Sequence, residues 1–324
     1  MRRGTVILVL LVVAGSLVLG LSAGAVPLSP AEVWAGLSAE DAPASVIVRD
    51  LRVPRVLLAF LVGGSLAVCG AALQAMIRNP LAEPYLLGLS GGAGLGAVVA
   101  LASRSAGPWA VPLAAFLGAL AAVGLVYRLS LVAGRRLDPR ILLLSGVVVG
   151  SFAGALMSAI IVLSDAPTVR NAFLWLLGGF GAASWQALGV FAAYAGLPLA
   201  AIGLSARSLD LIALGEEPAH HLGAEVDRTR RLVYLCTALL TAASVAACGI
   251  IGFVGLVVPH AVRSIARPIH RTLLPLVFAG GGSFLVLSDV VSRTVVRPLE
   301  LPVGVITALV GVPIFALLLR RSVA

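Results

Sequence analysis

The residues that could do chemistry in this chain are few, and their spacing forms no catalytic motif. The sequence contains neither HExxH nor GxSxG, the spacings of zinc-protease and serine-hydrolase sites. All 23 basic residues are Arg. A phosphate-binding P-loop needs a Lys on the nucleotide phosphates, so nucleotide hydrolysis by that route is excluded. We therefore predict no catalytic residue and no enzyme activity of the chain's own.

Ligands for a metal or a redox group are equally sparse. Cys69, Cys236 and Cys248 lie in apolar runs, their number is odd, and no CxxC pair occurs. This pattern is typical of small packing residues rather than of metal ligands or a disulfide. We expect His260 to be structural, because no cluster of His, Cys and Met accompanies it. The sequence predicts no metal site and no cofactor.

The composition places these residues in a membrane. The chain has 324 residues, of which 60% are hydrophobic and 11% charged. A soluble domain usually carries about 25% charged residues. Continuous apolar runs of about 20 residues indicate spanning helices, whereas β-barrel strands show short alternating segments. We predict an all-α, polytopic membrane protein, and we attribute the net charge of +9 to topology rather than to nucleic-acid binding.

The apolar runs predict ten spans in a single domain, 1–324. Spans one to six lie in 1–204, a polar loop covers 205–231, and spans seven to ten lie in 232–324. The first run resembles both a signal peptide ending at Ala23-Gly24-Ala25 and an uncleaved span, and its length favours the span. The predicted spans are 5–24, 53–77, 85–102, 109–132, 141–163, 187–204, 232–250, 252–265, 273–291 and 303–319.

The arginines predict the orientation of the loops. With the N-terminus inside, 16 of the 23 arginines fall on the inner side and 7 on the outer side. Cytoplasmic loops carry the excess of basic residues, so we predict that both termini and the 205–231 loop are cytoplasmic. The seven outer residues are Arg49, Arg52, Arg55, Arg104, Arg170, Arg293 and Arg297.

The 205–231 loop is the longest polar interruption in the chain. Such a stretch either links two helices or docks another protein. A loop of this length inside a compact chain is uncommon unless it is functional or disordered, and charge-rich stretches are often simply solvated. Gly215, Gly223 and Pro218 are placed to end or begin short helices. We expect two short helices joined by a turn.

An ordered set of motifs resembles the permease family of ABC importers for ferric siderophores, haem and cobalamin. The resemblance extends over nearly the whole chain, and it departs from the family pattern at 264–271, which is SIARPIHR. The motifs are RVPR at 52–55, Gln74 with RNPLAEP at 78–84, LGLSGGAG at 87–94, LGE at 214–216, GFVGLVVPH at 252–260, Asp289 with Arg293, ELPVG at 300–304 and GVPIF at 311–315.

The resemblance implies a type II importer fold and three partners. A homodimer would enclose the path in the inner (plasma) membrane, two cytoplasmic ATP-binding subunits would drive it, and a periplasmic or surface-tethered binding protein would deliver an iron chelate or cobalamin. Lipid surrounds the spans.

The resemblance also implies three groups of site residues. Arg52, Arg55 and Arg293 would dock carboxylates of the binding protein; anchoring at lipid headgroups is the simpler alternative. The ATPase would receive Leu214, Gly215, Glu216, Glu217, Ala219, Leu222 and Gly223. The fifth span would line the path with Ser145, Gly146, Gly150 and Ser151, although helix packing accounts for such small residues equally well.

An ion-coupled secondary transporter is the alternative function. Such transporters need ionisable groups at the membrane midplane. Glu83 and Asp289 are the carboxylates in or near spans, and both lie towards span ends, which counts against ion coupling. An intramembrane enzyme is the least favoured class.

Overall fold

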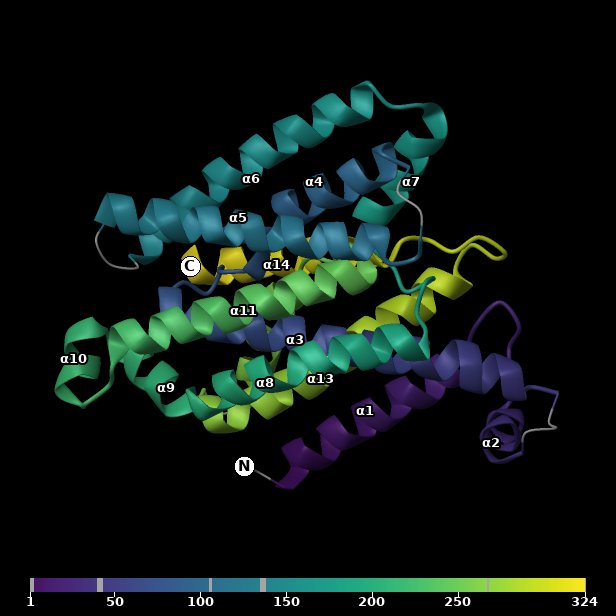
Figure 1. Cartoon of the computed structure of the whole chain (residues 1–324). Coiled ribbons are helices and arrows are strands. Elements are labelled where there is room, and N and C mark those ends of the chain that lie inside the picture. Colours follow the sequence, from purple (N-terminus) through teal and green to yellow (C-terminus); the bar gives the residue numbers. More distant parts are fainter. Residues whose placement is uncertain (1–2, 40–42, 105–106, 135–137, 267, 324) are drawn as a thin grey trace.

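The fold is an α-helical bundle in the part of the chain that the computed structural model describes, residues 3–39, 43–104, 107–134, 138–266 and 268–323 (Figure 1). The helices are α1 (Arg3–Ser22), α2 (Pro30–Ser38), the π-helical turn η1 (Ile47–Arg52), α3 (Val53–Ile77), the 3-10 turn η2 (Pro84–Leu87), α4 (Leu89–Ala102), α5 (Ala110–Gly134), α6 (Pro139–Val162), α7 (Ala166–Leu176), α8 (Trp185–Leu204), α9 (Ala206–Leu214), α10 (Glu216–His221), α11 (Val226–Cys248), α12 (Val254–Ile265), α13 (His270–Thr294) and α14 (Val303–Val323).

Each of the ten predicted spans coincides with an apolar helix. Among the described residues, seven helices are long and apolar enough to cross a membrane: α1, α3 with η1, α5, α6, α8, α11 and α13. Three shorter apolar helices, α4, α12 and α14, match the third, eighth and tenth predicted spans. The prediction of an all-helical polytopic membrane protein is confirmed.

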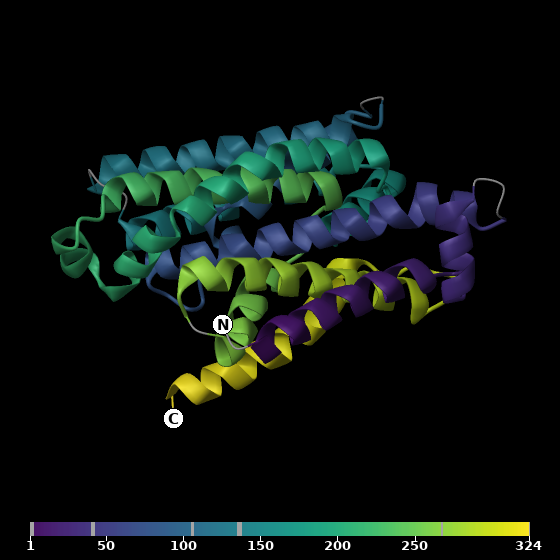
Figure 2. The same cartoon turned by 90° about the horizontal axis from the view of Figure 1, so that it is seen from below.

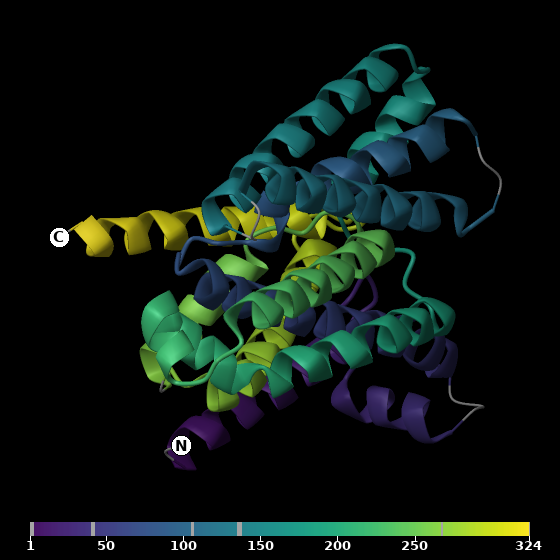
Figure 3. The same cartoon turned by 60° about the vertical axis from the view of Figure 1, so that its left-hand side comes forward.

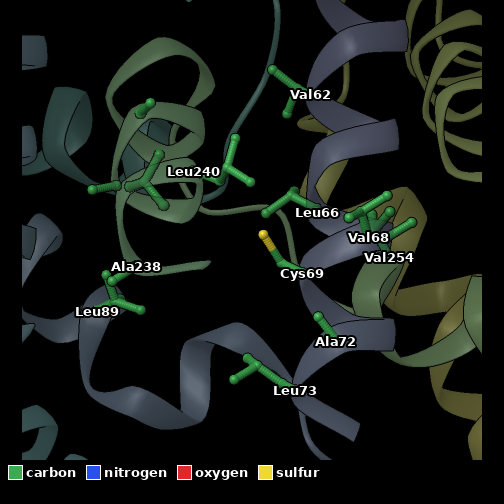
Figure 4. Close-up of a cluster of buried hydrophobic side chains, with 14 of the residues drawn as sticks. Val62, Leu66, Val68, Cys69, Ala72, Leu73, Leu89, Ala238, Leu240 and Val254 are labelled. Carbon is green, nitrogen blue, oxygen red and sulfur yellow. The ribbon is translucent and has the colours of Figure 1, made fainter. Parts of the chain in front are cut away.

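Helix α3 is the centre of the bundle. In the most apolar 18-residue window of Ile47–Ile77, 83% of residues are buried, against 28% in α5, α6 and α8. Side chains of α3, including Leu66 and Cys69, face Leu240 of α11 in the core (Figure 4). Glycine lets its neighbours approach closely, because a Cβ on Gly63 would overlap the Gly281 carbonyl of α13 and one on Gly70 would overlap the Gly255 carbonyl of α12.

The two ends of the bundle differ in what they present. Both termini lie towards the end that carries α9 and α10, and α2 lies at the opposite end (Figures 1, 2 and 3). This arrangement agrees with an even number of spans. We refer to the α9–α10 end as the inner end and to the α2 end as the outer end, following the predicted orientation.

One loop differs from expectation, and another lies partly outside the described residues. The predicted spans 5–24 and 53–77 leave 25–50 between them as a loop on the outer side, but this stretch contains α2 and η1. Helix α2 begins with a capping box, in which the Ser29 hydroxyl accepts from the Glu32 N–H and the Glu32 carboxylate accepts from the Ser29 N–H. The pattern S-P-A-E could have revealed this start. The 264–271 turn contains Arg267, which lies outside the described residues, as do Arg2, Arg135 and Arg136 of the inner loops.

Candidate coupling element, outer arginines and translocation face

The 205–231 stretch forms two short helices, as predicted. Helix α9 ends at Leu214, and Gly215 at φ +130° breaks the chain direction in a conformation that side chains rarely adopt. Helix α10 then begins with Glu216 and Glu217, whose charges suit a helix N-terminus, and Pro218 falls in its first turn. We call α9, Gly215 and α10 with Leu222 and Gly223 the coupling element; its role stays a prediction.

An ion pair and a set of hydrogen bonds tie the coupling element to two spanning helices. The Arg230 guanidinium of α11 donates to both carboxylate oxygens of Glu216, at 3.0 and 3.2 Å. The Asp210 carboxylate of α9 accepts from the backbone N–H of His270 at 2.9 Å and lies 2.5 Å from its ring Nδ1. Since His270 begins α13, the element is in direct contact with both α11 and α13.

The surface of the coupling element combines charge with exposed apolar side chains. Ala219 is fully buried in a small cluster with Ile212 and Val226, which holds α9 against α10. Leu214 is 67% exposed and Leu222 is 57% exposed. Glu216 and Glu217 are also exposed. The coupling element therefore presents two exposed leucines beside two exposed carboxylates.

The three outer arginines come together at the outer ends of α3 and α13, as predicted, but they point into the protein. Arg55 donates to Asp289, with Nη2 at 2.9 Å from Oδ1, and to Glu300 at 2.8 Å. Arg293 lies 3.1 Å from Asp289 and donates to the Gly20 carbonyl. Arg52 donates to the carbonyl of Ser22, the last residue of α1, and to that of Val26 in the segment that follows.

This pairing limits what the three arginines can offer to a partner. Arg52 and Arg293 are each 5% exposed, because they hold α1, α3 and α13 together at their outer ends. Among the described residues, Arg170 and Arg297 are the outer arginines that are exposed and make no ion pair. Sequence spacing could not separate these two sets, since each arginine simply lies near the end of an apolar run.

The loop before α7 carries another outer ion pair. Arg104 lies 2.8 Å from Asp165, and both side chains are exposed. Hydrogen bonds from Thr168 and the charge of Arg104 lower the pKa of Asp165, the N-cap of α7. The N-cap remains ionised at neutral pH, where its charge favours the helix.

The four predicted path residues of α6 divide into two kinds. Ser145 and Gly146 are buried, and a Cβ on Gly146 would overlap the Leu86 carbonyl of η2. Gly150 lies beside Gly88, so both glycines let η2 and α4 approach α6. Ser151 is exposed, on the same helix as Phe152 at 66% and Leu144 at 65% exposure. Packing accounts for Ser145 and Gly146, whereas Gly150 is half-buried and Ser151 lies on an open apolar face.

Glu83 and Tyr85 hold the turn between α11 and α12. The Phe253 N–H donates to Glu83 at 2.6 Å, and the Ile251 N–H donates to the Tyr85 hydroxyl at 3.2 Å. Phe253 itself has φ +68°. Further inwards, the buried Gln74 amide donates to the Gly255 carbonyl at 3.1 Å and its oxygen accepts from Arg263. Spacing along the chain could not reveal these contacts, because 83 and 253 lie far apart.

The two carboxylates considered for ion coupling are thus both engaged. Asp289 is 1% exposed between Arg55 and Arg293, and Glu83 caps the start of α12. Among the described residues, no group of three or more His, Cys, Asp and Glu is close enough to hold a metal ion. Within the described residues, both of these carboxylates have partners, and no cluster of His and Cys occurs.

Comparison with known proteins agrees with this architecture. The model of the FecCD transport family matches residues 8–321. The cobalamin import system permease protein BtuC of Halobacterium salinarum is 44% identical over 86% of this chain and 74% of its own length. The hemin transport system permease protein HmuU of Yersinia pestis is 39% identical over 92% of this chain and 90% of its own length.

A solved structure matches the whole fold. It is a metal-chelate type ABC transporter in an inward-facing conformation, and it superposes with a TM-score of 0.86 at 27% identity. The match covers 99% of this chain and 100% of the other. The likeness includes the short helices α4, α12 and α14, so their spanning role has the support of a complete structural match.

Proposed function

Since this chain belongs to the FecCD transport family, we propose that it is the permease subunit of an ATP-driven importer for an iron chelate, such as haem, or for cobalamin. It is a multi-pass membrane protein and the non-catalytic component of such a system. The relatives that import cobalamin and hemin support both cargo classes. The permease works with an ATPase and with a substrate-binding protein.

The coupling element is the observation that carries this proposal. It lies at the inner end, where an ion pair joins it to α11 and hydrogen bonds join it to α13. Its exposed Leu214 and Leu222 provide a docking surface for a subunit that binds ATP. Closure of that subunit on nucleotide would pull α9 and α10 and tilt the spans, shifting the population between outward-open and inward-open states.

We further propose that two copies of the chain and two ATPase subunits form the importer. The open face of α6, with Leu144, Phe152 and Ser151, is apolar enough to be covered by a second copy across a two-fold axis. Ser151 and Gly150 would then line the path between the copies. Small side chains there leave room for a bulky chelate.

The binding protein would dock at the outer end. The arginine cluster of Arg52, Arg55 and Arg293 contributes to this surface mainly through Arg55. Its partner Glu300 is in contact with solvent, because the Glu300 side chain is 47% exposed. A carboxylate of the partner would have to displace Glu300 to reach Arg55. The exposed Arg170 and Arg297 need no such exchange.

Reconstitution tests the proposal. The complete importer in proteoliposomes is expected to transport its cargo only when ATP is present on the side of the membrane that carries the ATPase subunits. Leu214→Asp with Leu222→Asp should lower ATP-dependent uptake at least tenfold and weaken ATPase binding, because charges would enter the docking surface. The matched control is Leu37→Asp on α2, an exposed leucine at the opposite end.

Two results would contradict the proposal. Uptake by the permease alone, without any ATPase, would show that the chain is not the passive component. Normal ATPase binding and uptake in the double variant would remove the coupling role from α9 and α10.

A further inference from the structure

A groove of about 620 Å³ opens at the inner end, between the coupling element and the ends of three spanning helices, α3, α6 and α11. Its volume is in the range of small-molecule sites. None of the residues proposed so far for cargo binding lies in it. The groove is lined by Ile77, Arg78, Asn79, Asp138, Arg140, Leu143, Glu216 and Arg230.

The groove holds more positive charge than its carboxylates neutralise. Glu216 pairs with Arg230, and Asp138 caps α6 by accepting from the Arg140 backbone N–H at 2.7 Å. In the part of the chain that the structure describes, the guanidinium groups of Arg78 and Arg140 make no ion pair and no hydrogen bond. Two unpaired cations therefore face a shared cavity.

Arg230 adds an unsatisfied donor. Its side chain is 5% exposed, and its buried Nε has no hydrogen-bond partner although both terminal nitrogens bind Glu216. A buried donor without a partner costs free energy, so the Arg230 guanidinium beside the groove is incompletely satisfied by the protein. Sequence spacing did not reveal this set, because Arg78 ends α3, Arg140 begins α6 and Arg230 lies in α11, far apart along the chain.

The groove is connected to the proposed path and to the coupling element. Leu143 lies two residues before Ser145 on α6, at the inner end of the open α6 face. Arg78 reaches the α9–α10 turn, where its Nη1 lies 3.7 Å from the position that a Cβ on Gly215 would occupy. Glu216 belongs to α10 itself. A shift of α10 would thus change the distance between the Glu216 carboxylate and the Arg230 guanidinium, and with it the net charge that the groove presents.

We propose that this groove binds an acidic group, a carboxylate or a phosphate, of the cargo as the cargo leaves the path on the inner side. The inference rests on the proposed import function and adds a charge requirement to it. Guanidinium groups match both anions in geometry. A lipid headgroup fits less well, because Ile77 and Leu143 are the two apolar lining residues and offer no lane for acyl chains.

Binding to the full chain in phosphatidylcholine nanodiscs tests the inference. The probes are haemin against its dimethyl ester, which lacks both free carboxylates, and cobalamin against cobinamide, which lacks the phosphodiester. At least one acidic probe should bind about tenfold more tightly than its partner. Arg78→Gln with Arg140→Gln should abolish this preference. Arg128→Gln, an exposed arginine at the inner end of α5 outside the groove, should retain it.

Each outcome decides the matter. Absence of a charge preference in both probe pairs, or its persistence in the double variant, overturns the inference. Loss of the preference when phosphatidylglycerol replaces phosphatidylcholine assigns the groove to lipid and also overturns it. Uptake by the complete importer is measured separately: ATP-driven uptake without a charge preference leaves the proposed function standing, whereas anion binding without uptake refutes that function alone.

Discussion

Asp289 is the residue on which the outer end depends most. It is 1% exposed and lies between Arg55 of α3 and Arg293 of its own helix, so one carboxylate pairs with two guanidinium groups, of which that of Arg293 is buried. Glu300 adds a second, partly exposed carboxylate to Arg55. The pairing converts residues that would be costly inside a membrane into a clamp between helices.

Removing the charge of Asp289 should therefore destabilise the fold. Breaking a buried ion pair leaves an uncompensated charge and typically costs about 3–5 kcal/mol. Asp289→Asn is expected to lower the midpoint of thermal unfolding in detergent, measured by loss of the monodisperse species after heating. Glu300→Gln is the graded control, since a half-exposed pair contributes only about 0–1 kcal/mol.

The opposite ranking would contradict this account. If Glu300→Gln destabilised the protein as much as Asp289→Asn, the cluster would be a surface network rather than a buried clamp. The sequence predicted that the arginines meet at one face, because topology alone fixes which ends are outer. The sequence could not predict that the arginine side chains point into the protein, because Asp289 and Glu300 are far from Arg55 along the chain and come close to it only in the folded structure.

At the scale of the elements, glycine residues allow α3, α12 and α13 to pack closely against one another. Gly64 lies against the Phe278 ring, and Gly282 against Phe60, where an added Cβ would come within 2.6 Å of ring atoms. The two phenylalanines in turn pack edge to face at 5.9 Å between centroids. Small residues in apolar runs predicted close packing, but the partner of each glycine became visible only in the fold.

A single methyl group at the α3–α12 crossing should separate the two helices. Gly70→Ala would place its Cβ against the Gly255 carbonyl, and overpacking of this kind typically costs about 1–3 kcal/mol. Both thermal stability and ATP-dependent uptake are expected to fall. Gly124→Ala on α5 provides the control, because nothing lies within 4 Å of its added Cβ.

If the Gly70 variant behaved like the Gly124 variant, the crossing would be loose and α12 free to move.

Helix α2 is the element that the sequence prediction missed. Its 9 residues are too short for a span, so it was assigned to a loop, although its capping box was present in the sequence.

At the scale of the molecule, the ten-span order was predictable because each apolar run is continuous and bounded by proline, glycine or arginine. The family and its permease function were predictable from the order of the motifs. The groove was not, since its arginines belong to the ends of three helices, α3, α6 and α11, that only the fold brings together.

The predicted orientation has a direct test. In a variant without Cys69, Cys236 and Cys248, single cysteines are introduced as Trp34→Cys on α2 and Glu217→Cys on α10. A membrane-impermeant maleimide should label position 34 on intact spheroplasts and position 217 only after permeabilisation. Both positions are exposed, so access depends on the side of the membrane. Labelling of position 217 from outside would reverse the topology.

The glycine contacts along α3 have a mechanical consequence. Main-chain atoms of α3 touch main-chain atoms of α12 and α13, so no rotamer change is available there to take up a small displacement. These three helices must travel as one stiff lever. We expect a displacement of the start of α13, transmitted through Asp210 and His270, to move the ion pairs around Asp289 at the other end of the same helix by a similar amount.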